Sequence, residues 1–439
     1  MSFGKGELNS LRLGPRLRFC DYIPDSLEKE NALNSLTDGV LFSVMAGLTN
    51  PFWGAFAVQL GASDYMLGLL TSLPALANLL AQIPAAIVID KFDNRLEPTL
   101  KFAFISRSFY LVFAFLPIVP LPSHVKAWTF IICYTLMRFP GTICDVAWLA
   151  LMGELFTPSL RARIFAERNM VCSLVSLVAT LVAGKMLDAL SWPVNYAILY
   201  FVGYIFVMGS WYYLGRLKEK PRPYAGENAR PAGLEAFKVV WKDKGFLRFI
   251  AAVAVVYLGF HIPAALWTIL WVKIMGLSNS WLGMFSTISG VMSFLSYNQW
   301  GKWSEKHGNL KVFIVTSGAH IIFPLLYGHF PSPYVHLAVN ALSGFFGAGL
   351  SLCLFNALLD LSSDVSRPAY TAVYNITLGV SAFIWPMVGV SIYEMLGMTA
   401  TLDLTFGIRV LGVAIAAYLL SDQIKRGLQD LSVIDADKV

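Results

Sequence analysis

Long apolar stretches recur along this chain, and they restrict its fold more than any other feature. Most of them exceed the roughly 18 residues that mark a helix able to cross a bilayer. Of the 439 residues, 56% are hydrophobic and 14% are charged, whereas soluble domains contain about 25% charged residues. The sequence therefore predicts an all-α polytopic membrane protein with twelve transmembrane helices, at about 35–59, 65–89, 99–121, 125–150, 165–187, 194–216, 246–271, 278–300, 310–330, 334–359, 371–393 and 402–421.

The distribution of lysine and arginine predicts the orientation, because positively charged loops resist translocation across the membrane. With the N-terminus in the cytoplasm, 27 of the 33 basic residues lie in segments on that side. The polar N-terminal segment has neither the apolar core nor the cleavage site of a signal peptide. We therefore expect a protein integral to the inner or plasma membrane, with both termini cytoplasmic.

The longest polar stretch divides the expected spans into two sets of six. It predicts a cytoplasmic tail (1–33), a first half (34–216), a central linker (217–245), a second half (246–421) and a cytoplasmic C-terminal tail (422–439). Within the linker, Leu234–Trp241 is amphipathic. Two interpretations of this piece remain open: a helix that lies on the inner membrane surface, or a solvated loop.

The two halves share a sequence repeat. Gly61-Ala-Ser-Asp-Tyr-Met-Leu-Gly68 reappears as Gly276-Leu-Ser-Asn-Ser-Trp-Leu-Gly283, and Asp90-Lys91-Phe-Asp-Asn94 reappears as Glu305-Lys306-His-Gly-Asn309, both at an offset of 215. A second set, offset by 206, pairs Glu154, Arg161 and Asn169 with Asp360, Arg367 and Asn375. Two sets in the same order indicate two copies of one six-helix unit.

These motifs resemble those of the major facilitator superfamily. Gly301-x3-Glu305-Lys306-x-Gly308 is similar to its loop signature G-x3-D-R/K-x-G, and the first copy keeps Asp90, Lys91 and Arg95 but has Ala86 and Asp93 where glycines are usual. Arg138-x2-Gly141 resembles the arginine motif of proton-coupled members. The resemblance implies a fold of two six-helix repeats. It assigns no subfamily, because the motifs of drug antiporters and sugar porters are missing.

The resemblance also implies a role for the charged loops, which latch the cytoplasmic side shut in facilitators. A loop carboxylate gains from the N–H groups and the positive end of a helix start. The latch residues implied in this way are Asp90, Lys91, Arg95, Glu154, Arg161, Glu305, Lys306, Asp360 and Arg367. The competing interpretation is that these charges serve only topology and solubility.

Ionisable residues within the spans are candidates for contact with a substrate or a proton, because each costs about 2.5–3.5 kcal/mol at mid-helix. These candidates are Asp38, Arg138, Asp145, His261, Arg107 and Arg409. In facilitators, helices 1, 4, 7 and 10 line the central cavity, which favours the first four. Arg107 and Arg409 fall on helices 3 and 12, where we expect a structural ion pair or snorkelling to the surface.

Structural roles compete with these assignments. Asp38 lies one turn from the expected inner end of the first span, so a helix cap is an equal alternative. His261 precedes Pro263 by two residues, and hydrogen bonding to a carbonyl freed at that kink is as consistent with the sequence as proton transfer. We expect His320 to be structural.

The resemblance implies a secondary active transporter that moves a small solute by alternating access. A coupling proton is one option, with Asp38 or Asp145 as its carrier. Three in-span arginines and two in-span aspartates leave a net positive interior, which favours an organic anion or a zwitterion. If an aspartate neutralises Arg138, a lipophilic drug or lipid exporter is expected instead. A non-transporting membrane receptor or scaffold is a further alternative.

Other functional classes lack their motifs in this sequence. An ATPase would need a G-x4-G-K-[ST] loop, and a hydrolytic enzyme would need a constellation such as serine, histidine and acid. The five cysteines form no CxxC pair, so we predict no metal site, disulfide framework or cofactor. The basic residues lie in loops rather than on one patch, so nucleic acid is not an expected partner. We expect a monomer that contacts a small solute and membrane lipid.

Overall fold

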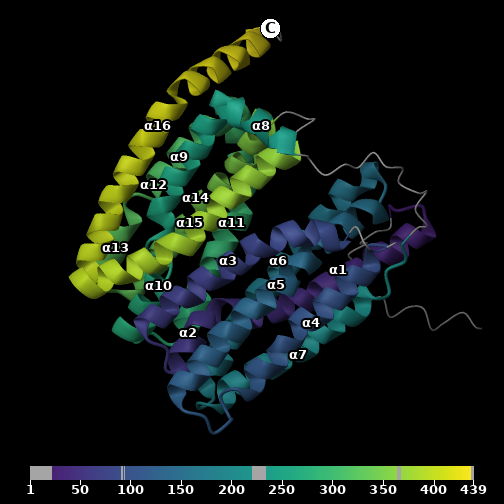
Figure 1. Cartoon of the computed structure of the whole chain (residues 1–439), viewed down its shortest axis with the longest axis vertical. Helices are drawn as coiled ribbons and strands as arrows, with labels where there is room; N and C mark the ends of the chain where they lie inside the picture. The colour runs from purple at the N-terminus through teal and green to yellow at the C-terminus, as the bar shows by residue number, and fades with distance from the viewer. Residues whose placement is uncertain (1–21, 90–91, 93, 220–233, 363–366, 437–439) are drawn as a thin grey trace, which may run out of the picture.

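The computed structural model describes residues 22–89, 92, 94–219, 234–362 and 367–436. This part of the chain is helical and contains no strand, which confirms the all-α prediction (Figure 1). The first seven helices and one turn are α1 (Ser26–Thr49), the 3-10 turn η1 (Asn50–Phe52), α2 (Trp53–Gln59), α3 (Asp64–Ile89), α4 (Leu96–Phe115), α5 (Ser123–Leu155), α6 (Pro158–Ala189) and α7 (Val194–Leu214). The remainder are α8 (Leu234–Lys242), α9 (Lys244–His261), α10 (Leu266–Thr268), the π-helix η2 (Ile269–Ile274), α11 (Asn279–His307), α12 (Asn309–Ala319), α13 (Phe323–His329), α14 (Pro333–Leu361), α15 (Arg367–Leu396) and α16 (Met398–Ala436).

Ten helical segments in the described chain are both long enough and apolar enough to cross a membrane. The helices α4 and α11 lie where the third and eighth spans were expected, but they are less apolar than the other segments. Lys101 and Arg107 interrupt the apolar run of α4, and serines and glycines dilute that of α11. By composition the count is therefore ten rather than the predicted twelve, although the order of long helices follows the prediction.

The helix α1 begins at Ser26, well before the expected start at residue 35, because Asp25 caps it. The Asp25 carboxylate accepts hydrogen bonds from the backbone N–H groups of Leu27 (2.7 Å) and Glu28 (3.3 Å). Asp38 lies about three turns further along the helix. The interpretation of Asp38 as the cap of the first helix is therefore wrong.

Three of the long segments are interrupted where a proline occurs. The first expected span breaks at η1, which contains Pro51. The seventh expected span, 246–271, breaks between α9 and α10, at Pro263. The ninth breaks between α12 and α13, where Pro324 lies in the first turn of α13. Proline has no N–H group and clashes with the preceding turn, so a helix cannot pass through it undisturbed. The kink expected near Pro263 is present, and the breaks at Pro51 and Pro324 accompany it.

The helices pack as two bundles. The helices α1–α7 contact one another, α8–α16 do the same, and the bundles meet mainly through two pairs, α3 with α15 and α6 with α11. Glycines allow the second pair to approach closely: a Cβ atom on Gly184 would lie 3.0 Å from the carbonyl oxygen of Asn279, and one on Gly283 would lie 3.1 Å from that of Thr180. In a membrane, such close packing of small residues holds helices together.

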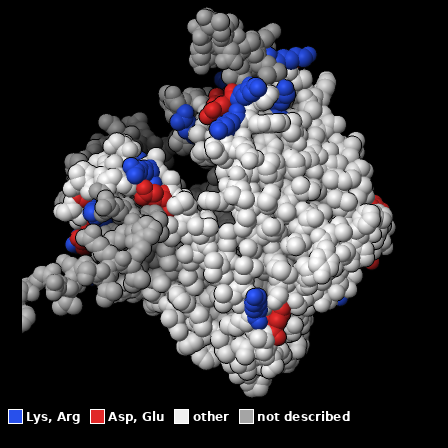
Figure 2. Space-filling model, turned by 180° about the vertical axis from the view of Figure 1, so that it is seen from behind, with Lys and Arg blue, Asp and Glu red and all other residues white. Residues whose placement is uncertain are grey.

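The two bundles form a V (Figure 1). The contacts of α6 with α11 involve Leu177, Thr180 and Gly184, all in the second part of α6. Toward the start of α6 the bundles separate, and the space-filling view shows a hollow between two lobes (Figure 2). We call the end at which α1 and α9 begin the open end, and the end at which α3 and α11 begin the closed end.

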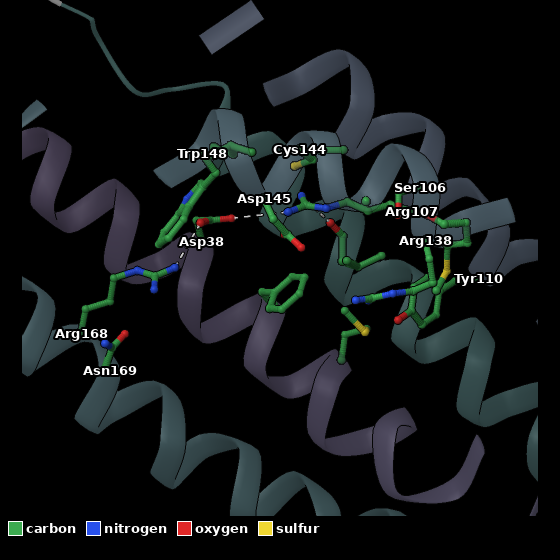
Figure 3. Close-up of a pocket in the computed structure, with 17 residues that line it drawn as sticks. Asp38, Ser106, Arg107, Tyr110, Arg138, Cys144, Asp145, Trp148, Arg168 and Asn169 are labelled. Carbon is green, nitrogen blue, oxygen red and sulfur yellow. Dashed lines mark hydrogen bonds and ion pairs between the residues drawn. The ribbon is translucent and has the colours of Figure 1, made fainter. Parts of the chain in front are cut away.

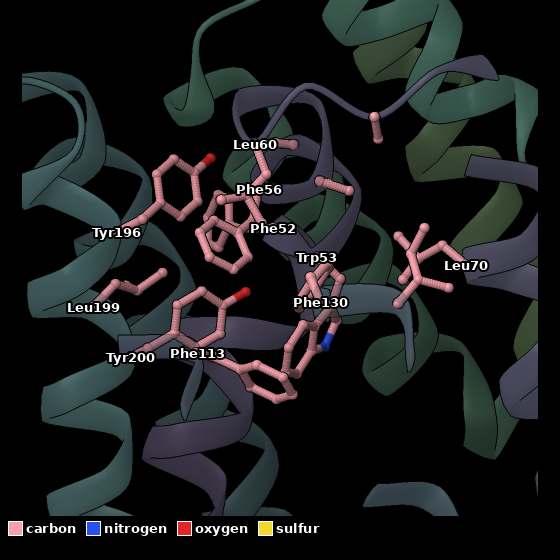
Figure 4. Packing of buried hydrophobic residues seen from close by; sticks show 14 of the residues in the cluster. Phe52, Trp53, Phe56, Leu60, Leu70, Phe113, Phe130, Tyr196, Leu199 and Tyr200 are labelled. Carbon is pink, nitrogen blue, oxygen red and sulfur yellow. The ribbon is translucent and has the colours of Figure 1, made fainter. Parts of the chain in front are cut away.

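Aromatic side chains form the core of the first bundle toward its closed end (Figure 4). The Trp53 ring stacks on Phe130 with ring centroids 5.7 Å apart, and Phe56 stacks on Tyr196 at 5.1 Å. The same buried cluster continues into the second bundle, where Leu266 belongs to it. The closed end is therefore packed across the boundary between the bundles.

Polar contacts between the bundles also hold the closed end. Asp188, near the end of α6, accepts hydrogen bonds from the backbone N–H groups of Asn279 (2.8 Å) and Ser280 (2.9 Å), with which α11 begins. The Lys273 ammonium donates to the Asp64 carboxylate at 2.7 Å. The positive end of the α11 dipole further favours the Asp188 carboxylate. We call these two contacts the closed-end latch.

Replacing Asp188 by alanine should weaken the closed-end latch, because two backbone N–H groups lose a charged acceptor. At an exposed carboxylate this loss is about 1 kcal/mol, which shifts the population about fivefold toward a state open at that end. The labelling rate of Leu282→Cys, a buried position on α11, measures the shift in a background without the native cysteines.

Asp403→Ala is the matched control, because that exposed carboxylate pairs with His329 inside the second bundle. Its labelling rate should equal that of the unmodified background. Equal labelling in the Asp188→Ala and Asp403→Ala proteins would contradict the role of the closed-end latch.

Candidate functional site

A cavity of about 410 Å³ lies inside the first bundle, between α1, α4, α5, α6 and α7 (Figure 3). Apolar, aromatic and charged side chains line it. The charged residues of the lining are Asp38, Arg107, Arg138, Asp145 and Arg168. We call this cavity the first-half pocket. It brings together four residues that the sequence singles out and a fifth, Arg168, that it does not.

Asp38 of α1 is buried, and groups from three other helices hold its carboxylate. Ser210 of α7 donates a hydrogen bond to its Oδ1 at 2.6 Å. Arg168 of α6 lies 3.5 Å from Oδ2, and Arg107 of α4 lies 3.9 Å from Oδ1. A buried carboxylate is tolerated only with such partners. Asp38 therefore joins four helices of the first bundle.

The two arginines beside Asp38 are also fixed by backbone carbonyl groups. Arg168 Nε donates to the carbonyl oxygen of Ser35 at 3.0 Å, and Arg107 Nη1 donates to that of Val207 at 3.2 Å. The ion pair expected for Arg107 is present, but this residue lines the pocket as well. Both guanidinium groups are thus committed to the protein.

Sequence reasoning missed Arg168 and Ser210. Arg168 lies three residues inside the fifth expected span, where a basic residue near a span end is usually topological. Glu167 and Asn169 flank it, so the sequence carries no signal that separates Arg168 from a polar span end. Ser210 carries no signal either, because a serine inside a transmembrane helix is common.

Arg138 and Asp145 of α5 both line the pocket (Figure 3). Arg138 Nε donates to Asn78 Oδ1 at 3.1 Å, and Thr142 donates to the same oxygen at 2.8 Å. No other group in the described chain bonds the Arg138 guanidinium, so its two Nη nitrogens are uncommitted. Asp145 is exposed in the pocket and forms no ion pair within the described residues. Arg138 and Asp145 do not form an ion pair with each other in the described chain.

His261 and Arg409 lie in the second bundle, away from the first-half pocket. The His261 Nδ1 lies 2.9 Å from the Ser381 hydroxyl oxygen, so this nitrogen bonds a hydroxyl rather than a freed carbonyl. Arg409 is buried and donates to the carbonyl oxygens of Gly259 (2.9 Å) and His320 (2.6 Å). Within the described chain it has no acidic partner, so the expected ion pair or snorkelling is absent.

This placement corrects the charge balance of the site. Arg409 is not part of it, and Arg168 takes its place, so three arginines still face two aspartates. If all are ionised, the first-half pocket carries a net positive charge of one. The net charge of the pocket therefore has the positive sign expected from the sequence, but Arg168 contributes to it in place of Arg409.

The described residues of the implied cytoplasmic latch lie toward the open end. Asp90 and Lys91 fall outside the described residues. Arg161 donates to the carbonyl oxygens of Gly153 and Phe156, and Asp360 accepts from Asn309 at 2.6 Å. The remaining members contact their own bundle or are exposed: Arg95 donates to Ile89, Arg367 donates to Ser362, and Glu154, Glu305 and Lys306 are exposed. The latch remains a prediction for a state in which the open end has closed.

Two bundles of apolar helices, the first of which encloses a charged pocket, are typical of secondary transporters. A model of the Major Facilitator Superfamily matches residues 39–298, and the chain belongs to this superfamily. No curated protein matches it by sequence.

Solved transporters share the fold. A mutant of the nucleoside transporter NupG superposes with a TM-score of 0.70 at 15% identity, covering 89% of this chain and 99% of that chain. A POT family transporter in complex with a thioalcohol-conjugated peptide gives 0.67 at 13%, covering 90% and 96%. A bacterial homologue of the lysosomal transporter Spinster, inward-facing and unoccupied, gives 0.61 at 15%, covering 91% and 96%. At these identities the likeness shows the fold alone.

Asp38→Asn should destabilise the protein strongly, because it leaves Arg107 and Arg168 without their shared counter-charge. Removing one partner of a buried ion pair costs about 3–5 kcal/mol. Thermal unfolding in detergent measures the loss. Asp145→Asn is the matched control, since it makes the same chemical change in the same pocket at an exposed residue without an ion pair. Equal melting temperatures for the two variants would show that Asp38 does not hold the bundle together.

Proposed function

We propose that this secondary transporter carries an organic anion or a zwitterion, and that Arg138 binds the anionic group. The observation that carries the proposal is the uncommitted pair of Nη nitrogens of Arg138 in the first-half pocket. A guanidinium with both Nη groups available matches a carboxylate or phosphate in bidentate geometry. Arg107 and Arg168 are occupied by Asp38, which leaves Arg138 for the solute.

The charge balance of the pocket supports the same solute class. Three arginines and two aspartates leave one uncompensated positive charge, and Coulomb terms are only weakly screened inside the protein. An anionic group would compensate this charge, whereas a cation would add to it. The exposed Asp145 offers a second, negative position for the cationic group of a zwitterion.

We further propose that the described conformation is open to the cytoplasm. The proposal rests on the positive-inside rule, which places the start of α1 and the central linker on the cytoplasmic side. The solute would then enter from the open end, and the bundles would rock about the pairs α3–α15 and α6–α11 to expose the other side. The closed-end latch would break in that step.

Arg138→Gln should weaken the binding of anionic solutes, and Arg138→Lys should weaken it less, because an ammonium keeps the charge but loses the bidentate fork. Competition binding with a panel of carboxylates, phosphates, zwitterions and hydrophobic cations measures the effect. We expect a loss of about 1.5–3 kcal/mol of binding free energy, or roughly tenfold or more in affinity, for the glutamine variant.

Two results would contradict this proposal. One is an Arg138→Gln protein that binds every anionic ligand with unchanged affinity. The other is wild-type protein that binds only hydrophobic cations, which would favour the lipophilic exporter. Lys302→Gln is a suitable control, because it removes an exposed positive charge on α11 that does not line the pocket.

If transport is proton-coupled, we propose Asp145 as the proton carrier. Its carboxylate is exposed to the pocket and forms no ion pair within the described part of the chain, so it can exchange protons with cavity water. Protonating Asp38 would instead leave the guanidinium groups of Arg107 and Arg168, which both lie within 4 Å of its carboxylate, without a counter-charge. Uptake by Asp145→Asn proteoliposomes should lose its dependence on a pH gradient. A variant that still concentrates solute when only a pH gradient is imposed would exclude Asp145.

A further inference from the structure

Two prolines in the second bundle deprive backbone carbonyl groups of their helical donors. In an α-helix each carbonyl accepts a hydrogen bond from the N–H group four residues later, and proline has no N–H group. Pro263 therefore leaves the carbonyl of Gly259 without its donor, and Pro324 does the same to His320. A long contact of 3.4 Å from the Phe323 N–H is the only backbone bond described for the His320 carbonyl. In a membrane such groups require another donor.

Arg409 of α16 supplies the missing donors to both carbonyl groups. Its Nε lies 2.9 Å from the oxygen of Gly259, and its Nη1 lies 2.6 Å from the oxygen of His320. The guanidinium also lies near the C-terminal ends of α9 and α12, where the helix dipoles favour a cation. This arrangement explains how a buried arginine is stable without an acidic partner among the described residues.

The surroundings of Arg409 fit it closely. A Cβ atom at Gly259 would lie 2.8 Å from Cγ of Arg409, so a larger residue there would displace the arginine. The ring of Phe260 packs against the guanidinium, with 4.7 Å between the ring centroid and Cζ. Gly259 and Phe260 at the end of α9, and Pro263 in the break that follows it, thus all shape the surroundings of Arg409.

The segment beyond Pro263, together with the start of α11, belongs to the part of the second bundle that contacts the closed end of the first bundle. Leu266 and Ile269 belong to the aromatic core of the first bundle. At the end of the same segment, Lys273 contacts Asp64 in the closed-end latch. The direction in which α10 and η2 leave α9 therefore decides whether Lys273 can reach Asp64 in the closed-end latch.

We propose that Arg409 is a positioning residue for transport, which replaces the two N–H donors that Pro263 and Pro324 lack and so holds α10 and η2 in the direction that closes the closed end. It acts through the backbone of the bent helices and contacts no solute. The role depends on alternating access within the superfamily fold and not on the solute class proposed above. Failure of either proposal therefore leaves the other intact.

A double-mutant cycle between Arg409 and Pro263 tests this role. In the Leu282→Cys protein, Arg409→Gln should raise the labelling rate about tenfold, because the carbonyls lose a charged donor. Pro263→Ala returns an N–H group to the Gly259 carbonyl. In that background Arg409→Gln should have a clearly smaller effect, so the two substitutions should not be additive. Arg409→Lys should rescue only in part, since one ammonium lacks the planar fork.

The native Cys353 distinguishes a positioning role from general loosening. It is fully buried on α14, away from the closed-end latch, and can be retained as the only native cysteine. Its labelling rate should stay at the wild-type value in Arg409→Gln protein. A parallel rise of labelling at Cys353 and at the closed end, or additive effects of Arg409→Gln and Pro263→Ala, would overturn the proposal.

If the Arg409→Gln protein does not fold, a further variant tests the positioning role of Arg409. The triple variant Pro263→Ala, Pro324→Ala, Arg409→Gln restores a backbone donor to both carbonyl groups. We expect it to fold and to show wild-type labelling of Leu282→Cys. A triple variant that still fails to fold would contradict the proposal, because the arginine would then be needed for something other than the two proline breaks.

Discussion

The requirement that a buried charge be paired governs the first bundle. The Asp38 carboxylate can lie within the membrane only because Ser210, Arg107 and Arg168 surround it. Since these partners come from three other helices, the carboxylate fixes how α1, α4, α6 and α7 pack. The same contacts bind two of the three pocket arginines, Arg107 and Arg168, to Asp38, so that neither is available to a solute. The Nη nitrogens of Arg138 remain available to a solute. Their availability follows from the way the helices pack.

The second bundle meets the same requirement without an acid. There the cation Arg409 is compensated by carbonyl groups that two prolines have freed, so that helix breaks and buried charge stabilise each other. The two bundles are repeats in sequence pattern, yet their polar interiors differ in chemistry. The first offers charged groups to a cavity, and the second uses its charge to shape a bent helix. We infer that solute contact and closure of the closed end are divided between the two bundles.

The fold was largely predictable because run lengths of apolar residues and a repeated spacing are local signals. The charged lining apart from Arg168 was predictable for a similar reason, since an ionisable residue stands out within an apolar run. Partners such as Ser210 and Asn78 are ordinary in sequence and gain meaning only from packing. Asp188 and Asn279 are 91 residues apart, so their contact depends on how α6 meets α11. The role of Arg409 required knowing which carbonyl groups the helix breaks leave free.

We propose that binding of an anionic group in the first-half pocket drives the bundles from one arrangement to the other. Distances between spin labels test it directly, with one pair at Arg163 and Lys302 near the open end and another at Leu190 and Tyr334 near the closed end, all exposed positions. In membranes titrated with organic anions, zwitterions and hydrophobic cations, we expect an anion or zwitterion to shorten the first distance and lengthen the second. Distances that respond only to hydrophobic cations, or that change in the same sense at both ends, would contradict it.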